Sequence, residues 1–244
     1  MTAVGLIPAR YAASRFPGKP LTPIAGKPMI QHVYEGARRA KRLQDVVIAT
    51  DDERIAEACS AFDAPVVLTS PDHPTGTDRL AEAAAGLDAE IIVNIQGDEP
   101  LIRGFVIDAA VDALLAEPDA AMSTVVHAAE PEALDDPNRV KVVLDRRGRA
   151  LWFSRAAIPA LRNADAPPTW WQHVGLYVYR RSFLLDFVNL PQTPAELAEG
   201  LEQLRALEHG FAIQAAIVEG WRSVSVDVPE DVARVEALLA EAGR

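Results

Sequence analysis

Short apolar runs rich in β-branched residues alternate with longer amphipathic stretches over about the first 115 residues. Short apolar runs of this kind are typical of buried strands, and Ala-rich stretches with apolar residues three and four apart are typical of helices. The predicted strands are 4–7, 46–49, 66–69 and 91–95, and the predicted helices are 28–43, 52–62, 77–87 and 104–116. This alternation predicts an α/β fold with a mostly parallel sheet flanked by helices.

The second half of the chain is less regular. Its predicted strands are 122–127, 140–144, 150–153 and 174–179, and its predicted helices are 194–207 and 229–241. Residues 162–169 include Asn-Ala-Asp-Ala-Pro-Pro and predict a loop. No linker is long enough to separate independent domains. We therefore expect a single domain over residues 1–244, in which the half at about 119–244 inserts into, or extends, the sheet of the half at about 1–118.

Composition and charge exclude several classes of protein. The chain is 49% hydrophobic and 24% charged, which is ordinary for a soluble globular protein. Its net charge of −11 disfavours nucleic acid as a partner. We find neither an apolar run of membrane-spanning length nor a signal peptide, and the single Cys59 forms no internal disulfide. These features predict a cytoplasmic protein without membrane insertion.

The loop after the first predicted strand is basic, although the chain as a whole is acidic. Residues 10–23 carry Arg10, Arg15 and Lys19 around a Gly/Pro-rich turn, and no acidic residue precedes Glu35. Forked arginine donors and the lysine point charge suit phosphate oxygens, and Gly18 permits close backbone approach. The spacing matches neither the P-loop nor the dinucleotide fingerprint. Because ligands bind beyond the carboxyl ends of parallel strands, this loop predicts a nucleotide triphosphate site; an ordinary solvated loop is the alternative.

Two carboxylates follow apolar runs far apart in the sequence. Asp98 lies in Asn-Ile-Gln-Gly-Asp-Glu-Pro after the most apolar predicted strand, and Asp227 lies in Val-Asp-Val-Pro-Glu-Asp. Mg²⁺ binds through one or two carboxylates together with phosphate oxygens. As alternatives, Asp98 or Glu99 caps a turn, and Asp227 is the N-cap of a helix that starts at Pro229. Two carboxylates from separate strand ends favour the metal.

Two further segments could bind small polar groups. Residues 69–79 place hydroxyls, a glycine and an arginine in a loop that opens a helix, where they could bind a base or ribose, although Thr77 and Asp78 would also serve as N-caps. His173 begins an alternating strand with Tyr177 and Tyr179 on its own face. A lone histidine of this kind is more often structural than functional.

These segments, in this order, resemble the 3-deoxy-manno-octulosonate cytidylyltransferase (CMP-Kdo synthetase) family over nearly the whole chain. The most specific matches are Arg-Phe-Pro-Gly-Lys-Pro-Leu at 15–21, Gln-Gly-Asp-Glu-Pro at 96–100 and Leu-Glu-Gln-Leu-Arg at 201–205. Looser matches occur at 7–10, 26–29, 49–52, 76–79, 140–143, 153–155, 158–159, 173–177 and 227–231.

The resemblance implies an enzyme that transfers CMP from CTP to the anomeric hydroxyl of 3-deoxy-D-manno-octulosonate (Kdo). The products would be pyrophosphate and CMP-Kdo for lipopolysaccharide biosynthesis. It also implies a Rossmann-like fold of the nucleotide-diphospho-sugar transferase type, dependence on Mg²⁺, and a cytoplasmic homodimer. The half at about 1–118 would bind the nucleotide, and the half at about 119–244 would bind the sugar and form the dimer.

The resemblance also implies roles for individual residues. The catalytic residues would be Arg10, Arg15, Lys19 and Asp98. The nucleotide would contact Ala9, Arg10, Arg15, Lys19, Thr69, Gly76, Thr77, Arg79 and Gln96. The sugar would contact Gln96, Arg155, His173, Tyr177, Glu202 and Gln203, and the metal would contact Asp98 and Asp227.

Some departures from the family pattern keep alternatives open. The residues that flank Asp227 differ from the usual Gly-Ile/Val-Asp-Thr, and the stretch before His173 is short and carries Trp170 and Trp171. These tryptophans could line the sugar pocket, pack at a dimer interface or simply be buried. An amino-substituted Kdo (8-amino-Kdo) or a sialic-acid-like sugar is an alternative substrate. A non-catalytic nucleotide-binding module is a third alternative, but it predicts loss of Asp98, Asp227 or Lys19, and all three are present.

Overall fold

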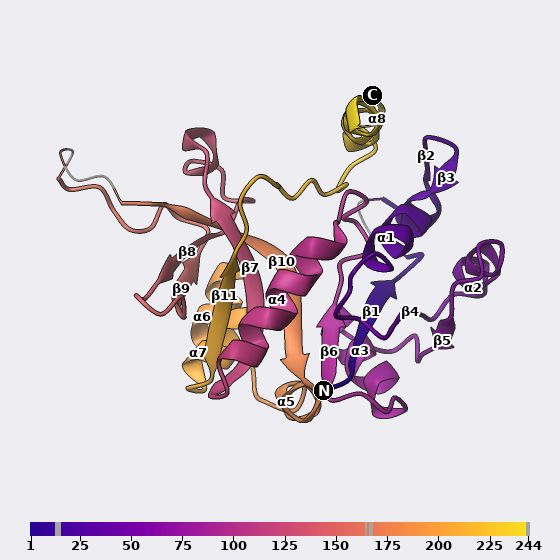
Figure 1. The fold of residues 1–244 in the computed structure, drawn as a ribbon, viewed down its shortest axis with the longest axis horizontal. Helices are drawn as coiled ribbons and strands as arrows, with labels where there is room; N and C mark the ends of the chain where they lie inside the picture. The colour runs from indigo at the N-terminus through magenta and orange to yellow at the C-terminus, as the bar shows by residue number, and fades with distance from the viewer. Residues whose placement is uncertain (13–15, 164, 166–167, 243–244) are drawn as a thin grey trace. The chain divides into compact units, whose positions relative to one another are not determined.

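The computed structural model describes the chain except residues 13–15, 164, 166–167 and 243–244. The chain forms two compact units (Figure 1). The first unit comprises Met1–Asp108 and Ser223–Arg244, and the second comprises Ala109–Arg222. This division differs from the predicted halves, because the boundary lies before residue 118 and the C-terminal segment belongs to the first unit.

The strands of the first unit are parallel neighbours in the order β6, β1, β4, β5. Their bounds are Ala3–Ala9 for β1, Asp45–Thr50 for β4, Val66–Leu68 for β5 and Ile91–Asn94 for β6. The core of β1 is apolar, and Leu6 and Ile7 are fully buried. All four predicted strands of the first half are therefore confirmed, with ends that differ by at most two residues.

Helices α1 (Met29–Ala37), α2 (Glu53–Ser60) and α3 (Gly76–Ala85) follow these strands and pack against them. The Asp52 carboxylate caps α2 by accepting from the Arg54 backbone N–H at 3.0 Å. The first helix ends well before the predicted residue 43. None of the helices in the described ranges is long and apolar enough to cross a membrane.

The C-terminal segment packs against the rest of the first unit through a small apolar cluster. Val224, Val226 and Val235 form one buried cluster with Ile24 and Met29. Val235 belongs to α8 (Asp231–Ala242), and Ile24 belongs to a short hairpin of β2 (Pro23–Ile24) and β3 (Lys27–Pro28) next to the 3₁₀ helix η1 (Lys19–Leu21). This apolar contact is the physical reason why residues 223–244 depart from the predicted second half.

The second unit contains a mixed set of strands. Strand β7 (Ala120–Ala128) pairs antiparallel with β10 (Trp171–Arg180) and parallel with β11 (Ala212–Ile217). Strand β8 (Lys141–Leu144) pairs antiparallel with β10 and with β9 (Ala150–Ser154). The sequence did not predict β11, because its alanines lack the β-branched signal of a strand; pairing with β7 supplies what local propensity does not. The α/β class with a mixed, mostly parallel sheet flanked by helices is confirmed.

The predicted helix over 194–207 is wrong as a single element. Helix α6 (Pro194–Glu199) ends at Gly200, whose φ of 60° lies in the left-handed region, and α7 (Gln203–Glu208) follows as a separate helix. Glycine adopts this conformation at little cost, so it terminates α6. Helix α5 (Arg181–Phe187), which was not predicted, follows β10 directly, and the short 3₁₀ helix η2 (Pro131–Ala133) follows β7. Helix α4 (Gly104–Ala116) forms over the predicted residues.

Candidate active site

The Lys19 ammonium lies between two carboxylates and a backbone carbonyl. Its Nζ donates to Asp98 Oδ2 at 2.7 Å and to the Val226 carbonyl at 3.0 Å, and it lies 3.8 Å from Asp227 Oδ1. Lys19 opens η1 directly after Gly18, which has a left-handed φ of 72° and donates its N–H to the Tyr11 carbonyl at 2.8 Å. The structure therefore brings together three of the residues that the sequence singled out.

Backbone contacts hold the two carboxylate-bearing segments together. The Val226 N–H donates to the Asp98 carbonyl at 2.9 Å. Directly before Asp98, a Cβ added to Gly97 would lie 2.9 Å from the Pro8 carbonyl oxygen, so only glycine allows this close approach to the end of β1. The segment after β6, the end of β1 and the C-terminal segment thus meet around Lys19.

Asp227 is not the N-cap of the last helix. Helix α8 begins at Asp231, and the Asp231 carboxylate accepts from the N–H groups of Asp227 and Val228 at 2.8 and 3.0 Å. The Asp227 side chain instead accepts from the Ser225 hydroxyl at 3.2 Å and is 56% exposed. The capping alternative for Asp227 is therefore removed, and its carboxylate remains accessible.

The oxygen atoms around Lys19 are of the kind that bind a hard cation such as Mg²⁺. They are two carboxylates and one carbonyl, all oxygen, and Mg²⁺ takes one or two carboxylates while substrate phosphates and water complete its shell. Within the described part of the chain, no group of three or more histidine, cysteine or acidic side chains could hold a metal ion. The oxygen atoms that are present fit a cation whose remaining ligands would come from a phosphate and from water.

Glu99, beside Asp98, has a structural role in this region. It is 8% exposed, one carboxylate oxygen accepts from the Val224 N–H at 3.2 Å, and the other accepts from the Ser223 hydroxyl. Burial, with a smaller contribution from the charge of Asp98, raises the pKa of Glu99 to about 7. Glu99 therefore fixes Ser223 and Val224, which precede Val226 and Asp227 in the chain.

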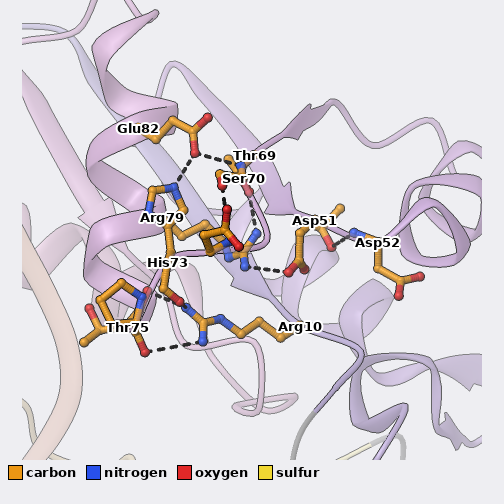
Figure 2. Close-up of polar contacts among 12 residues, drawn as sticks. Arg10, Asp51, Asp52, Thr69, Ser70, His73, Thr75, Arg79 and Glu82 are labelled. Atoms are coloured by element: carbon orange, nitrogen blue, oxygen red, sulfur yellow. Dashed lines mark hydrogen bonds and ion pairs between the residues drawn. The ribbon is translucent and has the colours of Figure 1, made fainter.

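Arg10 is tied to the loop that opens α3 (Figure 2). Its Nη2 donates to the carbonyls of His73 and Thr75 at 2.6 and 2.7 Å. His73 in turn contacts Glu82, which also accepts from the Ser70 N–H at 2.9 Å. Arg10 thus lies at the carboxyl end of β1, as predicted, and its contact with phosphate stays a prediction. Arg15 lies outside the described residues.

Helix α3 begins differently from the prediction. Thr75 is its N-cap and forms a capping box with Asp78, whereas Gly76 and Thr77 lie inside the first turn. Thr77 is 3% exposed. Thr77 is therefore not the N-cap, and Asp78 takes part in the cap only as the N3 residue of the box, where its carboxylate accepts from the Thr75 N–H at 3.0 Å.

Arg79 is fully buried and pairs inside the protein (Figure 2). Its Nη2 lies 2.9 Å from Asp51 Oδ2, and its Nη1 donates to the Thr69 hydroxyl. The sequence did not single out Asp51. It is the first residue after β4, just as the basic loop directly follows β1. Elsewhere in the predicted set, Ala9 pairs with Thr50 at the end of β1, and Gln96 donates to Asn94 Oδ1 at 3.2 Å.

The second unit gathers the predicted sugar-binding residues of β10 and α7. His173 Nε2 lies 3.0 Å from the Thr124 hydroxyl, and the Tyr177 hydroxyl donates to Gln203 Oε1 at 3.1 Å. The ring centroids of His173 and Tyr177 are 5.4 Å apart, so the prediction that they share a face is confirmed. Gln203 is buried at the start of α7, and Glu202 precedes it as the N-cap.

Burial determines the protonation states of this cluster. It lowers the pKa of His173 to about 3 and, together with the charge of Glu202, raises the pKa of Tyr177 above its usual range. Both side chains are thus neutral at physiological pH. A neutral imidazole and a phenol can each donate and accept, which suits sugar hydroxyls.

We expect the His173 imidazole to remain neutral between pH 5 and pH 8. Its pKa is about 3 in the folded state and 6.5 ordinarily, so between these pH values the unfolded chain binds a proton that the folded chain does not. The free energy of unfolding therefore decreases as the pH falls from 6.5 towards 3. The measurement is an NMR titration of the histidine ring resonances, with His173→Gln to assign the signal. A His173 resonance that titrates between pH 6 and pH 7 would contradict the burial argument.

Arg155 lies in a set of carbonyl contacts within the second unit. Its guanidinium donates to the carbonyls of Glu199 and Pro137 at 2.6 and 2.9 Å. The Lys141 ammonium, fully buried, donates to the Arg155 carbonyl at 2.6 Å. Lys141 was not predicted, although a lysine inside an apolar strand run is a signal for a buried charge. The direct contact of Arg155 with sugar stays a prediction.

The two tryptophans before His173 are both partly buried. The Trp170 indole N–H donates to the Pro159 carbonyl at 3.0 Å, and Trp171 begins β10. Trp170 thus closes the loop that the sequence predicted over 162–169, in which the described residues form no helix or strand.

Comparisons with known proteins show which family the chain belongs to. The cytidylyltransferase family model matches residues 4–216. A 3-deoxy-manno-octulosonate cytidylyltransferase from Solibacter usitatus is 52% identical over 97% of this chain and 94% of its own. One from Syntrophotalea carbinolica is 53% identical over 98% of this chain and 99% of its own.

One solved structure supports the same family, and a second shares the fold. A CMP:2-keto-3-deoxy-manno-octonic acid synthetase complexed with CTP superposes with a TM-score of 0.95 and 42% identity, over 99% of this chain and 100% of that one. A 4-diphosphocytidyl-2C-methyl-D-erythritol synthase from Anaerococcus prevotii, 12% identical with a TM-score of 0.64 over 98% of each chain, shares the fold. The chain therefore belongs to the 3-deoxy-manno-octulosonate cytidylyltransferase family.

Proposed function

We propose that this protein transfers CMP from CTP to the anomeric hydroxyl of Kdo, forming CMP-Kdo for lipopolysaccharide biosynthesis and releasing pyrophosphate. The observation that carries the proposal is the meeting of Lys19, Asp98 and Asp227 next to the end of β1. A phosphate-binding cation beside two carboxylates is what a metal-assisted nucleotidyl transfer requires. Relatives near 50% identity that carry the name of this activity support the choice of substrates.

On the nucleotide side, Lys19, Arg10 and Arg15 would hold the triphosphate of CTP. An arginine has five N–H donors, so Arg10 can contact both the 73–75 carbonyls and a phosphate. This dual contact would link the phosphate to the start of α3, where Gly76 and Thr77 lie. We propose that these two residues bind the cytidine. Ala9, Thr69 and Gln96 would complete this part of the site, while the buried Arg79 would support Thr69 from within.

The chemical step is an in-line displacement at the α-phosphorus. The anomeric oxygen of the sugar forms the new bond to the α-phosphorus and releases its proton to solvent, while the bond from the α-phosphorus to the α–β bridging oxygen breaks and pyrophosphate leaves. Lys19 and Arg15 would stabilise the charge on the departing pyrophosphate. We propose that Asp98 and Asp227 hold Mg²⁺, which would supply charge neutralisation and lower the pKa of the attacking hydroxyl. Catalysis then rests mainly on positioning and electrostatics.

On the sugar side, we propose that His173, Tyr177 and Gln203 bind the hydroxyls of Kdo. Their neutral hydrogen-bonding groups are held by burial and by the Tyr177–Gln203 contact. Arg155, Glu202 and Gln96 would provide further polar contacts. We also propose that the protein is a cytoplasmic homodimer, in keeping with the family resemblance; the buried free Cys59 fits a reducing compartment.

The test is pyrophosphate release from CTP in the presence of Mg²⁺, with Kdo, 8-amino-Kdo and N-acetylneuraminate offered separately and UTP as the nucleotide control. We expect release with CTP and Kdo. An 8-amino-3,8-dideoxy-manno-octulosonate cytidylyltransferase from Shewanella woodyi is 49% identical, so the amino sugar is the informative competitor. Release with 8-amino-Kdo alone would mean that the amino sugar, not Kdo, is the substrate. No release with any sugar would overturn the proposed activity.

A further inference from the structure

The Lys19 ammonium has the surroundings of a bound cation. Its side chain is 17% exposed, and its three N–H donors face the Asp98 carboxylate, the Val226 carbonyl and, at longer range, the Asp227 carboxylate. These are the same oxygen atoms that fit Mg²⁺. An ammonium and a divalent cation cannot occupy one position, and their like charges repel each other at short range.

We infer that Lys19 is the internal counterion of Asp98 and Asp227 in the nucleotide-free protein, and that a divalent cation gains these carboxylates when a triphosphate draws Lys19 away. This inference rests on the proposed function, because it takes the triphosphate as the ligand of Lys19. One side chain would thus have two alternative partners, a pair of carboxylates and a phosphate.

The local structure allows Lys19 to change partner without rebuilding the loop. The backbone around it is fixed by hydrogen bonds from the Gly18 N–H to the Tyr11 carbonyl and from the Thr22 N–H to the Lys19 carbonyl, at 2.8 and 3.1 Å. The flexible four-carbon stem can therefore move the ammonium while the turn stays in place. Loss of the ammonium leaves two carboxylates close together, and that repulsion favours entry of a divalent cation.

The consequence is that nucleotide and metal bind with positive coupling. A ligand shifts an equilibrium only by its different affinity for the two states, and the triphosphate favours the state in which Lys19 has left the carboxylates. Because coupling between two binding events is reciprocal, the metal must also strengthen nucleotide binding. In the absence of nucleotide, by contrast, Lys19 competes with the metal.

The experiment measures Mn²⁺ binding without nucleotide, by electron paramagnetic resonance of the free ion. We expect Lys19→Met to bind Mn²⁺ roughly tenfold or more tightly than the unmodified protein, since a hydrogen bond between charged groups is worth at least this factor. Lys27→Met is the matched control, because Lys27 pairs with Glu35 at 2.8 Å and not with Asp98 or Asp227, and it should behave like the unmodified protein. Adding Asp98→Asn to Lys19→Met should remove the gain.

Two results would overturn the inference. The first is equal Mn²⁺ affinity in the unmodified protein and in Lys19→Met, or in Lys19→Gln should the methionine variant fail to fold. The second needs no lysine variant: tight Mn²⁺ binding to the nucleotide-free protein that Asp98→Asn abolishes. Neither readout depends on turnover, so failure of the inference is distinguishable from failure of the proposed function, which appears as absence of pyrophosphate release from the unmodified protein.

Discussion

Replacing Asp98 by asparagine is expected to lower turnover by roughly a thousandfold while leaving the fold intact. The substitution keeps the shape of the side chain and an oxygen that can accept from Lys19, but removes the charge that would bind the metal. Loss of a single electrostatic group that stabilises a transition state typically costs a factor of about 10² to 10³, and Asp98 would act through the charge of the metal it holds. The measurement is steady-state pyrophosphate release, with circular dichroism to check the fold.

The matched control is Asp88→Asn, which removes an exposed carboxylate from the same unit and should leave turnover unchanged. Asp227→Asn should also lower turnover, but less, because Asp227 is 56% exposed and lies 3.8 Å from Lys19 rather than 2.7 Å. Near-complete activity in both site variants would rule out a role for these carboxylates as metal ligands.

The hydrophobic pattern was sufficient to predict the parallel part of the sheet and the edge at which a ligand is expected to bind. Each strand of the first unit is a short apolar run, and the residues directly after β1 are the basic loop. Once the strands are parallel, the polar residues that follow them must lie at one edge. The predicted position of both residues at strand ends is consistent with their contact, in which Lys19 Nζ lies 2.7 Å from Asp98 Oδ2.

The sequence could not predict contacts between segments that lie far apart along the chain. Asp227 reaches Lys19 because Val224 and Val226 pack with Ile24 and Met29, and because the Val226 N–H bonds to the Asp98 carbonyl. No local pattern distinguishes valines that pack on a distant hairpin from valines in a strand. For the same reason, β11 and the separate helices α6 and α7 were missed, since pairing with β7 and a left-handed Gly200 determine them.

The direction of the Arg79 side chain could not be predicted from its sequence motif. The pattern Gly-Thr-Asp-Arg indicates a polar loop before a helix, but it does not say on which side of the helix the guanidinium lies. In the structure the side chain is directed inward, to Asp51 and Thr69 (Figure 2). Its burial separates two roles that the sequence could not separate: support of the loop from within and direct contact with the nucleotide.

Replacing Arg79 by methionine is expected to lower the free energy of unfolding by roughly 3 kcal/mol. The change leaves the Asp51 carboxylate, which is 19% exposed, without the cation that lies 2.9 Å away, and breaking a buried pair by removing one partner has this cost. The measurement is urea unfolding followed by circular dichroism. Arg38→Met is the control, because Arg38 is half exposed and pairs with Asp45 on the surface at 3.2 Å, so its loss should cost about 1 kcal/mol or less.

A double variant separates support from direct contact. If Arg79 acts through Asp51, adding Asp51→Asn to Arg79→Met should restore part of the lost stability, because the uncompensated charge is gone. CTP affinity, measured by calorimetry at a temperature where each variant is folded, should then recover in parallel. An Arg79→Met variant with unchanged stability and much weaker CTP binding would instead mean that the guanidinium contacts the nucleotide itself, and the inward-facing pair would have to open when the nucleotide binds.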